Sequence, residues 1–171
     1  METAILLGNE QNMENRVRAY IEIAQRAEVF KLPEIEVLKE VLYDFKSSPG
    51  FNYITFDENV NGDIVGFIIF GKTPLTSVTW DIYWLAVDKQ YQGKGYGKKL
   101  IKRVEEFVEQ QQGPHVLRVE TSTRKEYAHA RNLYLRMKYS EAGRILDFYE
   151  PGDDLVIFYK KIDNSKVVPA Q

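Results

Sequence analysis

The sequence predicts a mixed α/β fold of the α+β type, with a mostly antiparallel central sheet and helices on both of its faces. Residues 16–45 carry apolar side chains at helical spacing, and residues 51–87 contain three strand-like segments in succession. The remaining segments read as helix, strand, helix and two strands. Consecutive strands predict an antiparallel meander, and each strand–helix–strand passage predicts local parallel pairing.

Two helices are expected first, over residues 16–30 and 32–45. Their apolar positions recur three or four residues apart, at Val17, Tyr20, Ile21, Ala24 and Ala27 or Glu28, then at Ile35, Leu38, Val41, Leu42 and Phe45. Pro33 suits the first turn of the second helix, because the nitrogen there needs no partner within the helix. The apolar segment 4–7 is the candidate for an additional first strand.

The three strand-like segments cover residues 51–58, 63–71 and 77–87. Asn61–Gly62 joins the first two and has the composition of a tight hairpin turn. From Gly95 the pattern becomes helical, and Gly113–Pro114 ends it. One stripe of this helix is apolar and consists of Leu100, Ile101, Val104, Phe107 and Val108.

The last third of the chain is expected to form a strand over 115–121, a helix, and strands over 141–149 and 154–162. Thr123 and Glu126 have the spacing of a capping box, which predicts the start of the helix. Ala130, Leu133, Tyr134 and Met137 share one face of it. The sequence therefore predicts a single domain over residues 1–162, with residues 163–171 as a frayed tail.

The composition excludes several classes of function. The 171 residues carry a formal net charge of -2, so no overall field attracts nucleic acid. There is no cysteine, which excludes disulfides, zinc–thiolate sites and a cysteine nucleophile. No metal is expected, because His115 and His129 lack partners at metal-ligand spacing. Without a secretory signal or an apolar stretch of about 20 residues, the chain is expected to be cytoplasmic and to have no membrane partner.

The segment QGKGYGKK, residues 92–99, predicts a site for a polyphosphate. Glycines at every second position let main-chain N–H groups approach a ligand, and the helix that follows offers its unpaired N–H groups. Lys94, Lys98 and Lys99 can add positive charge. Neither the Walker pattern nor the dinucleotide fingerprint has this spacing. The alternatives are a tight turn with a solvated basic face and a basic patch for nucleic acid, against which the net charge argues.

The segment LAVDKQYQGKGYG, residues 85–97, matches the formula Q/R-x-x-G-x-G/A with Gln92, Gly95 and Gly97, or in a second register with Gln90, Gly93 and Gly95. On these residues the sequence resembles the GNAT superfamily of acyl-CoA-dependent N-acetyltransferases. The first register is preferred, because Gly93 then takes the family's common extra glycine. The resemblance spans residues 17–162 in element order and includes the pattern A-x-x-x-Y at Ala130 and Tyr134. Tyr127 and Lys138–Tyr139 depart from the family's usual Asn and Gly-Phe.

The resemblance implies acetyl-CoA as the co-substrate. It implies that the turn binds the pyrophosphate, that the strand end 85–87 pairs with the pantetheine arm, and that Asn132 bonds a pantetheine amide. Gln92 is expected to cap or orient the arm. The cofactor-binding residues expected on this basis are Leu85, Ala86, Val87, Gln92, Gly93, Lys94, Gly95, Tyr96, Gly97, Lys98 and Asn132.

Acetyl transfer to an amine needs a proton acceptor, because a primary amine is protonated at neutral pH. Asp81 interrupts an apolar, aromatic strand and lies where some members of the family carry a glutamate base, so it is the candidate base, acting through a water. The alternatives are a solvent-facing strand residue and a structural hydrogen-bond acceptor. The resemblance implies that Tyr134 donates its phenolic proton to the CoA thiolate; a core position is its alternative.

The expected function is therefore N-acetyl transfer from acetyl-CoA to a primary amine of a small molecule. A non-catalytic acyl-CoA-binding module with the same fold is the alternative. The turn with Glu150, Asp153 and Asp154 is expected to be solvated, with attraction of a cationic acceptor as the alternative. The sequence leaves the acceptor's identity open, and an exposed edge strand could pair in a homodimer.

Overall fold

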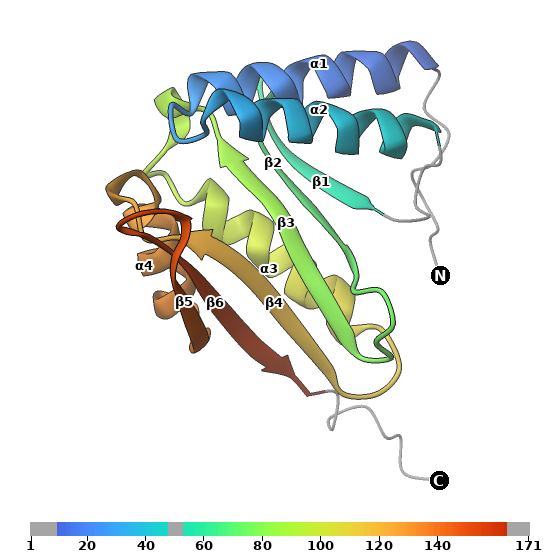
Figure 1. Ribbon diagram of the computed structural model, residues 1–171. Coiled ribbons are helices and arrows are strands. Elements are labelled where there is room, and N and C mark those ends of the chain that lie inside the picture. The colour runs from blue at the N-terminus through green and yellow to red at the C-terminus, as the bar shows by residue number, and fades with distance from the viewer. Residues whose placement is uncertain (1–9, 48–52, 164–171) are drawn as a thin grey trace, which may run out of the picture. The chain divides into compact units, whose positions relative to one another are not determined.

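The computed structural model describes residues 10–47 and 53–163, and its ribbon is drawn in Figure 1. The candidate strand at residues 4–7 and the expected tail beyond residue 163 lie outside the described residues. The elements are α1 (Glu10–Arg26), α2 (Leu32–Ser47), β1 (Ile54–Val60), β2 (Asp63–Lys72), β3 (Thr79–Val87), η1 (Lys89–Tyr91), α3 (Tyr96–Glu109), β4 (His115–Ser122), η2 (Lys125–Tyr127), α4 (Ala128–Arg136), β5 (Ser140–Glu150) and β6 (Asp153–Ile162). No helix in this part of the chain is long and apolar enough to cross a membrane.

The six strands follow the order β1-β2-β3-β4-β6-β5 in one sheet. The chain divides into two compact units, one of residues 1–69 and 84–100 and the other of residues 70–83 and 101–171. The boundary runs through β2, β3 and α3, so each of these elements contributes to both units. The expected mixed, mostly antiparallel sheet with accompanying helices is confirmed.

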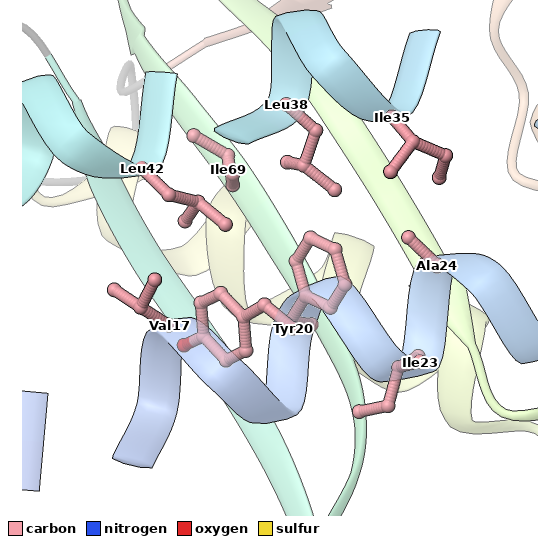
Figure 2. Close-up of a cluster of buried hydrophobic side chains, with 10 residues drawn as sticks. Val17, Tyr20, Ile23, Ala24, Ile35, Leu38, Leu42 and Ile69 are labelled. Atoms are coloured by element: carbon pink, nitrogen blue, oxygen red, sulfur yellow. The ribbon is translucent and has the colours of Figure 1, made fainter. Parts of the chain in front are cut away.

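In the first unit, α1 and α2 lie side by side and bury their apolar stripes on β2 (Figures 1 and 2). Leu38 and Leu42 of α2 are fully buried, each contributing about 1.5–3 kcal/mol. The ring of Tyr20 stacks on Phe67, with 4.3 Å between centroids. Ile23 is also fully buried although it lies outside the expected stripe, because the buried face of α1 is wide enough to include the neighbour of Ala24.

Strand β2 has helices on both faces within the first unit. Phe67 and Ile69 belong to the cluster beneath α1 and α2. Successive residues of a strand face opposite sides of the sheet, so Gly66 faces away from the side of Phe67. It lies against Leu100 of α3. At the start of β2, Asn61 and Gly62 have φ of +53° and +93°. Both are left-handed, as the expected tight hairpin turn requires.

In the second unit, β4 pairs in parallel with the first half of β3 and antiparallel with β6. The parallel pairing expected across α3 is confirmed. The parallel pairing expected across α4 is wrong, since β6 lies between β4 and β5. In this position between β4 and β5, strand β6 buries apolar residues, among them Val156 and Phe158.

Strand β5 is the edge strand beyond β6, and nearly all of its residues are exposed. Ile145, Leu146 and Phe148 are each about half exposed or more. The register shifts between Ile145 and Glu150, where Asp147 takes a φ of +53°. Its carboxylate accepts the N–H of Gly152 at 2.6 Å, which fixes the bulge onto the hairpin turn.

The capping box expected at Thr123 and Glu126 is not formed. The hydroxyl of Thr123 instead accepts the N–H of Asp154 at 2.8 Å, and the N–H of Thr123 donates to the carbonyl of Asp154 at 3.1 Å. A 3-10 turn, η2, precedes α4, and neither has a side-chain cap. A tertiary bond to the β5–β6 hairpin therefore replaces the local cap.

Candidate functional site

The turn from β3 to α3 is fastened at its start by two side chains. Asp88 accepts the N–H of Gln90 at 3.1 Å and so caps η1. The side-chain amide of Gln92 donates to the carbonyl of Val87 at 3.0 Å. This bond folds the turn back onto the end of β3. The side chain of Gln92 is therefore engaged with the main chain at the end of β3.

The glycines of this turn have the conformation and the free space that a close-fitting ligand requires. Gly93 and Gly95 have φ of +74° and +89°, a region that side chains with a Cβ rarely adopt. A Cβ built at either position would meet no atom within 4 Å. The main chain here is therefore uncovered on the side where a side chain would project.

Helix α3 begins directly after these glycines. Its first internal bond runs from the N–H of Lys99 to the carbonyl of Gly95, at 3.0 Å. The N–H groups of Gly95, Tyr96, Gly97 and Lys98 precede that bond and have no partner within the helix. Four main-chain donors at the positive end of a helix dipole form an arrangement that binds anions.

The three lysines expected to add charge have different surroundings. The ammonium of Lys94 lies 4.9 Å from the centre of the Tyr91 ring, a cation–π distance, and Lys98 is exposed. Lys99 instead pairs with the buried carboxylate of Glu58 on β1, with Nζ and Oε2 at 2.5 Å. Because a buried carboxylate needs compensation, this pair stabilises Glu58 in the fold, although Lys99 itself is largely exposed.

Gly66 is a residue of this site that sequence reasoning missed. A Cβ there would lie 3.1 Å from the carbonyl oxygen of Ala86, 3.2 Å from Val87 and 3.4 Å from Leu100. Only the absence of a side chain lets β2 approach the end of β3 and the start of α3 so closely. A glycine inside an apolar strand was the available signal, since such glycines often mark close approach.

In the second unit, Asp81 is buried and its carboxylate is already engaged. Arg118 of β4 forms a bidentate pair with it, at 2.6 Å from Nε to Oδ1 and 3.0 Å from Nη2 to Oδ2. The hydroxyl of Thr73 donates to Oδ2 at 2.8 Å. The hydrogen bond to Asp81 is the main cause that raises the pKa of Arg118. Three of about four acceptor positions on this carboxylate are therefore occupied.

Tyr134 lies on the buried face of α4, with its ring against Tyr139 and Phe158 at 5.9 and 5.8 Å between centroids. Burial raises its pKa well above the ordinary value, because the phenolate would lose its hydration. The phenol is thus held in its protonated, donating form. Asn132 on the same helix is exposed.

Arg131 anchors the start of α4. Its guanidinium donates to the carbonyls of Ser122 and Arg124, at 2.5 and 2.9 Å, and burial lowers its pKa. The hydroxyl of Ser122 in turn donates to the buried carboxylate of Asp153 at 2.5 Å. Asp153, expected in a solvated turn, is therefore an internal acceptor. No pattern in the sequence indicated this arrangement.

Asp154, expected to be solvated with Asp153, also has structural contacts. Its carboxylate pairs with Arg144 at 3.3 Å and accepts the N–H of Asp147 at 3.0 Å. These bonds hold the β5–β6 hairpin together, whereas Glu150 is exposed.

The expected residues fall into two groups. The strand end 85–87 and the turn residues 92–98 belong to the first unit, whereas Asp81, Asn132 and Tyr134 belong to the second. Across residues 10–47 and 53–163, no group of three His, Asp or Glu side chains is arranged to hold a metal ion.

Comparison with known proteins gives the family. Residues 16–139 match the model of the acetyltransferase (GNAT) family. An uncharacterized N-acetyltransferase of Methanocaldococcus jannaschii is 30% identical over 142 residues, which cover 81% of this chain and 83% of that protein. A protein from Desulfovibrio desulfuricans, described as a GNAT-family acetyltransferase, matches with a TM-score of 0.81 and 27% identity, over 86% of this chain and 93% of that one.

A further solved structure was crystallised with its cofactor acetyl-CoA. It is YncA of Salmonella typhimurium, which has a TM-score of 0.70 and 15% identity, over 97% of both chains, and so supports the fold alone. The family match and the archaeal relative together cover most of this chain. The protein is a member of the GNAT family of acetyltransferases.

Proposed function

We propose that this chain transfers the acetyl group of acetyl-CoA to a primary amine of a small molecule. The turn between β3 and α3 carries the proposal. Its two left-handed glycines leave the main chain uncovered, and four N–H groups at the start of α3 have no partner within the helix. Each helix-end interaction with an anion is worth only about 0.3–1 kcal/mol, so several donors acting together with Lys94 and Lys98 are needed to hold a pyrophosphate.

The strand end Leu85–Val87 is proposed to pair with the pantetheine arm, and Asn132 to bond one of its amides. The exposure of Asn132 leaves its amide accessible to a ligand. When bound, acetyl-CoA supplies the activated thioester, and the chain's own residues bind, orient and exchange protons.

Tyr134 is proposed as the acid. Since burial keeps its phenol protonated, it can donate a hydrogen bond to a departing thiolate. The attacking amine must lose a proton, at a cost of roughly 4–5 kcal/mol for a lysine-like amine at pH 7. Asp81 is proposed to take that proton through a water at its remaining acceptor position. The bond to Arg118 gives this residue a second role, that of orienting the guanidinium.

The test is a thermal or urea unfolding experiment with and without acetyl-CoA. At about 100 times its Kd the ligand adds roughly 2.7 kcal/mol to the free energy of unfolding. Absence of any shift at millimolar acetyl-CoA would reject both the enzyme and the non-catalytic binding module. A thiol-release assay over a panel of amines then separates these two, since only the enzyme releases CoA in proportion to acceptor.

A further inference from the structure

Asp88 joins the turn between β3 and α3 to the rest of the first unit. It is 5% exposed and follows directly after β3. Its N–H donates to the carbonyl of Val65 on β2 at 2.9 Å, and its own carbonyl accepts the N–H of Tyr91 at 2.8 Å. One carboxylate oxygen caps η1 through Gln90 at 3.1 Å. The residue therefore fixes the start of the turn through its main chain and its side chain together.

The other oxygen of Asp88 is held by Arg26, in the last turn of α1. The distance from Nε to Oδ2 is 2.7 Å, which is within the range of a charge-assisted hydrogen bond. A second ion pair, between Glu28 and Lys89, joins the same two segments. The end of α1 and the connection that follows it thus contact two successive residues after β3, Asp88 and Lys89.

Beyond this anchor, the Tyr91 ring contacts Tyr96 at 6.0 Å between centroids and the Lys94 ammonium at 4.9 Å from its own centre. Residues 92–95 are exposed, and open space surrounds the Cβ positions of both left-handed glycines. A chain of this kind takes its position from its ends. The downstream end is the first turn of α3, and the upstream end is Asp88 with the bond from Gln92 to Val87.

We propose that Arg26 is a positioning residue for the cofactor: its guanidinium holds the Asp88 carboxylate, and thereby sets the turn 89–95 in the conformation that receives the pyrophosphate. Arg26 itself touches no part of the turn beyond Asp88 in the contacts described. The inference rests on the proposed binding of acetyl-CoA. It adds a residue from α1, more than 60 positions away in sequence, to the determinants of cofactor affinity.

Arg26→Met tests the proposal, because methionine keeps most of the apolar stem and removes the guanidinium. The Kd for acetyl-CoA, measured by calorimetry on the full chain, is expected to rise about tenfold. The KM for acetyl-CoA is expected to rise with it, while kcat at saturating acetyl-CoA changes less than twofold. Arg26→Lys, which keeps a cationic donor, is expected to recover part of the affinity.

Two controls match this substitution. Glu22→Gln removes the other partner of Arg26, 3.3 Å away on the exposed side of α1, and leaves Asp88 untouched. Lys39→Met removes a charge from an exposed ion pair on α2. Both are expected to keep the Kd of the unmodified protein. If Arg26 and Asp88 act as one unit, Asp88→Asn adds little further loss to Arg26→Met.

Hydrogen exchange separates this proposal from the proposed function. In Arg26→Met the N–H groups of Gln90 and Tyr91, both bonded to Asp88, are expected to exchange faster, with α2 unchanged. Acetyl-CoA binding by the unmodified protein together with an unaltered Kd in Arg26→Met overturns the positioning role alone. No acetyl-CoA binding by the unmodified protein overturns the proposed function and this inference with it, whatever the exchange rates.

Discussion

Tyr134 and Asp81 are single residues whose environments predict different behaviour. Tyr134 lies in an apolar cage that favours the neutral phenol, whereas Asp81 lies in a polar one that occupies most of its carboxylate. Removal of the Tyr134 hydroxyl takes away a hydrogen-bond donor, whereas loss of the Asp81 negative charge also weakens the ion pair with Arg118. Substitutions that keep the shape of each side chain distinguish their roles.

Tyr134→Phe is expected to lower kcat by about 10²-fold, because the leaving thiolate loses a proton donor. The KM for acetyl-CoA should change little, since the ring and its contacts remain. Thiol-release kinetics measure both quantities. Tyr43→Phe on α2 is the matched control, since that tyrosine is 60% exposed. Full activity of Tyr134→Phe would remove Tyr134 from the mechanism.

Asp81→Asn separates the two roles of this carboxylate. If Asp81 accepts the proton, the substitution lowers kcat. Arg118→Met should then reduce kcat less than Asp81→Asn does. If instead Asp81 acts by orienting Arg118, both substitutions lower kcat equally, which would contradict the assignment as base.

The elements around the turn between β3 and α3 are packed together by a few close approaches between main chain and side chain. Strand β2 is the central example, because a Cβ at Gly66 would lie within 3.4 Å of both the Ala86 carbonyl oxygen of β3 and Leu100 of α3. The end of β3 and the start of α3 both contribute to the proposed cofactor site. An added methyl group at Gly66 should therefore displace both the end of β3 and the start of α3.

Gly66→Ala is expected to destabilise the protein by about 1–3 kcal/mol, because the new methyl group would push on the main chain at Ala86. The Kd for acetyl-CoA is expected to rise as well. Urea unfolding and calorimetry provide the two measurements. Gly143→Ala on β5 is the control, since a Cβ there meets nothing within 4 Å. Equal free energies of unfolding for both variants would show that β2 can shift to accommodate the methyl group without loss of stability.

At the scale of the whole molecule, three buried tyrosines make the free energy of unfolding depend on pH in the alkaline range. Burial raises the pKa of Tyr20, Tyr134 and Tyr139 above the ordinary value of about 10. The folded state therefore retains these protons above pH 10, whereas the unfolded chain releases them. Because the folded state then binds more protons, the free energy of unfolding must fall as pH rises.

Urea unfolding from about pH 8 to about pH 11 should show a constant free energy of unfolding up to about pH 10 and a decline beyond it. Each buried tyrosine adds about 1.4 kcal/mol per pH unit to the slope. Tyr139→Phe should reduce the slope by one tyrosine's share, and Tyr43→Phe should leave it unchanged. Phenolate absorbance that develops fully near pH 10 in the folded protein would contradict this account.

The sequence predicted much of the fold because local patterns carry it. Helical periodicity, the Asn61–Gly62 turn and the glycines after β3 each depend on residues close together in the chain. The Asp81–Arg118 and Arg26–Asp88 pairs join residues 37 and 62 positions apart, and only the sheet register and the packing of α1 determine them. The same holds for the insertion of β6 between β4 and β5, which no local signal distinguishes from a simple β–α–β passage.

The bulge at Asp147 has a consequence for how this protein behaves at high concentration. An outermost strand with apolar side chains is an open template onto which further chains can stack into fibrils. On β5 the regular pleat is broken between Ile145 and Glu150, so an incoming strand would find only short straight stretches to copy. We therefore expect the bulge to disfavour the addition of further strands along β5.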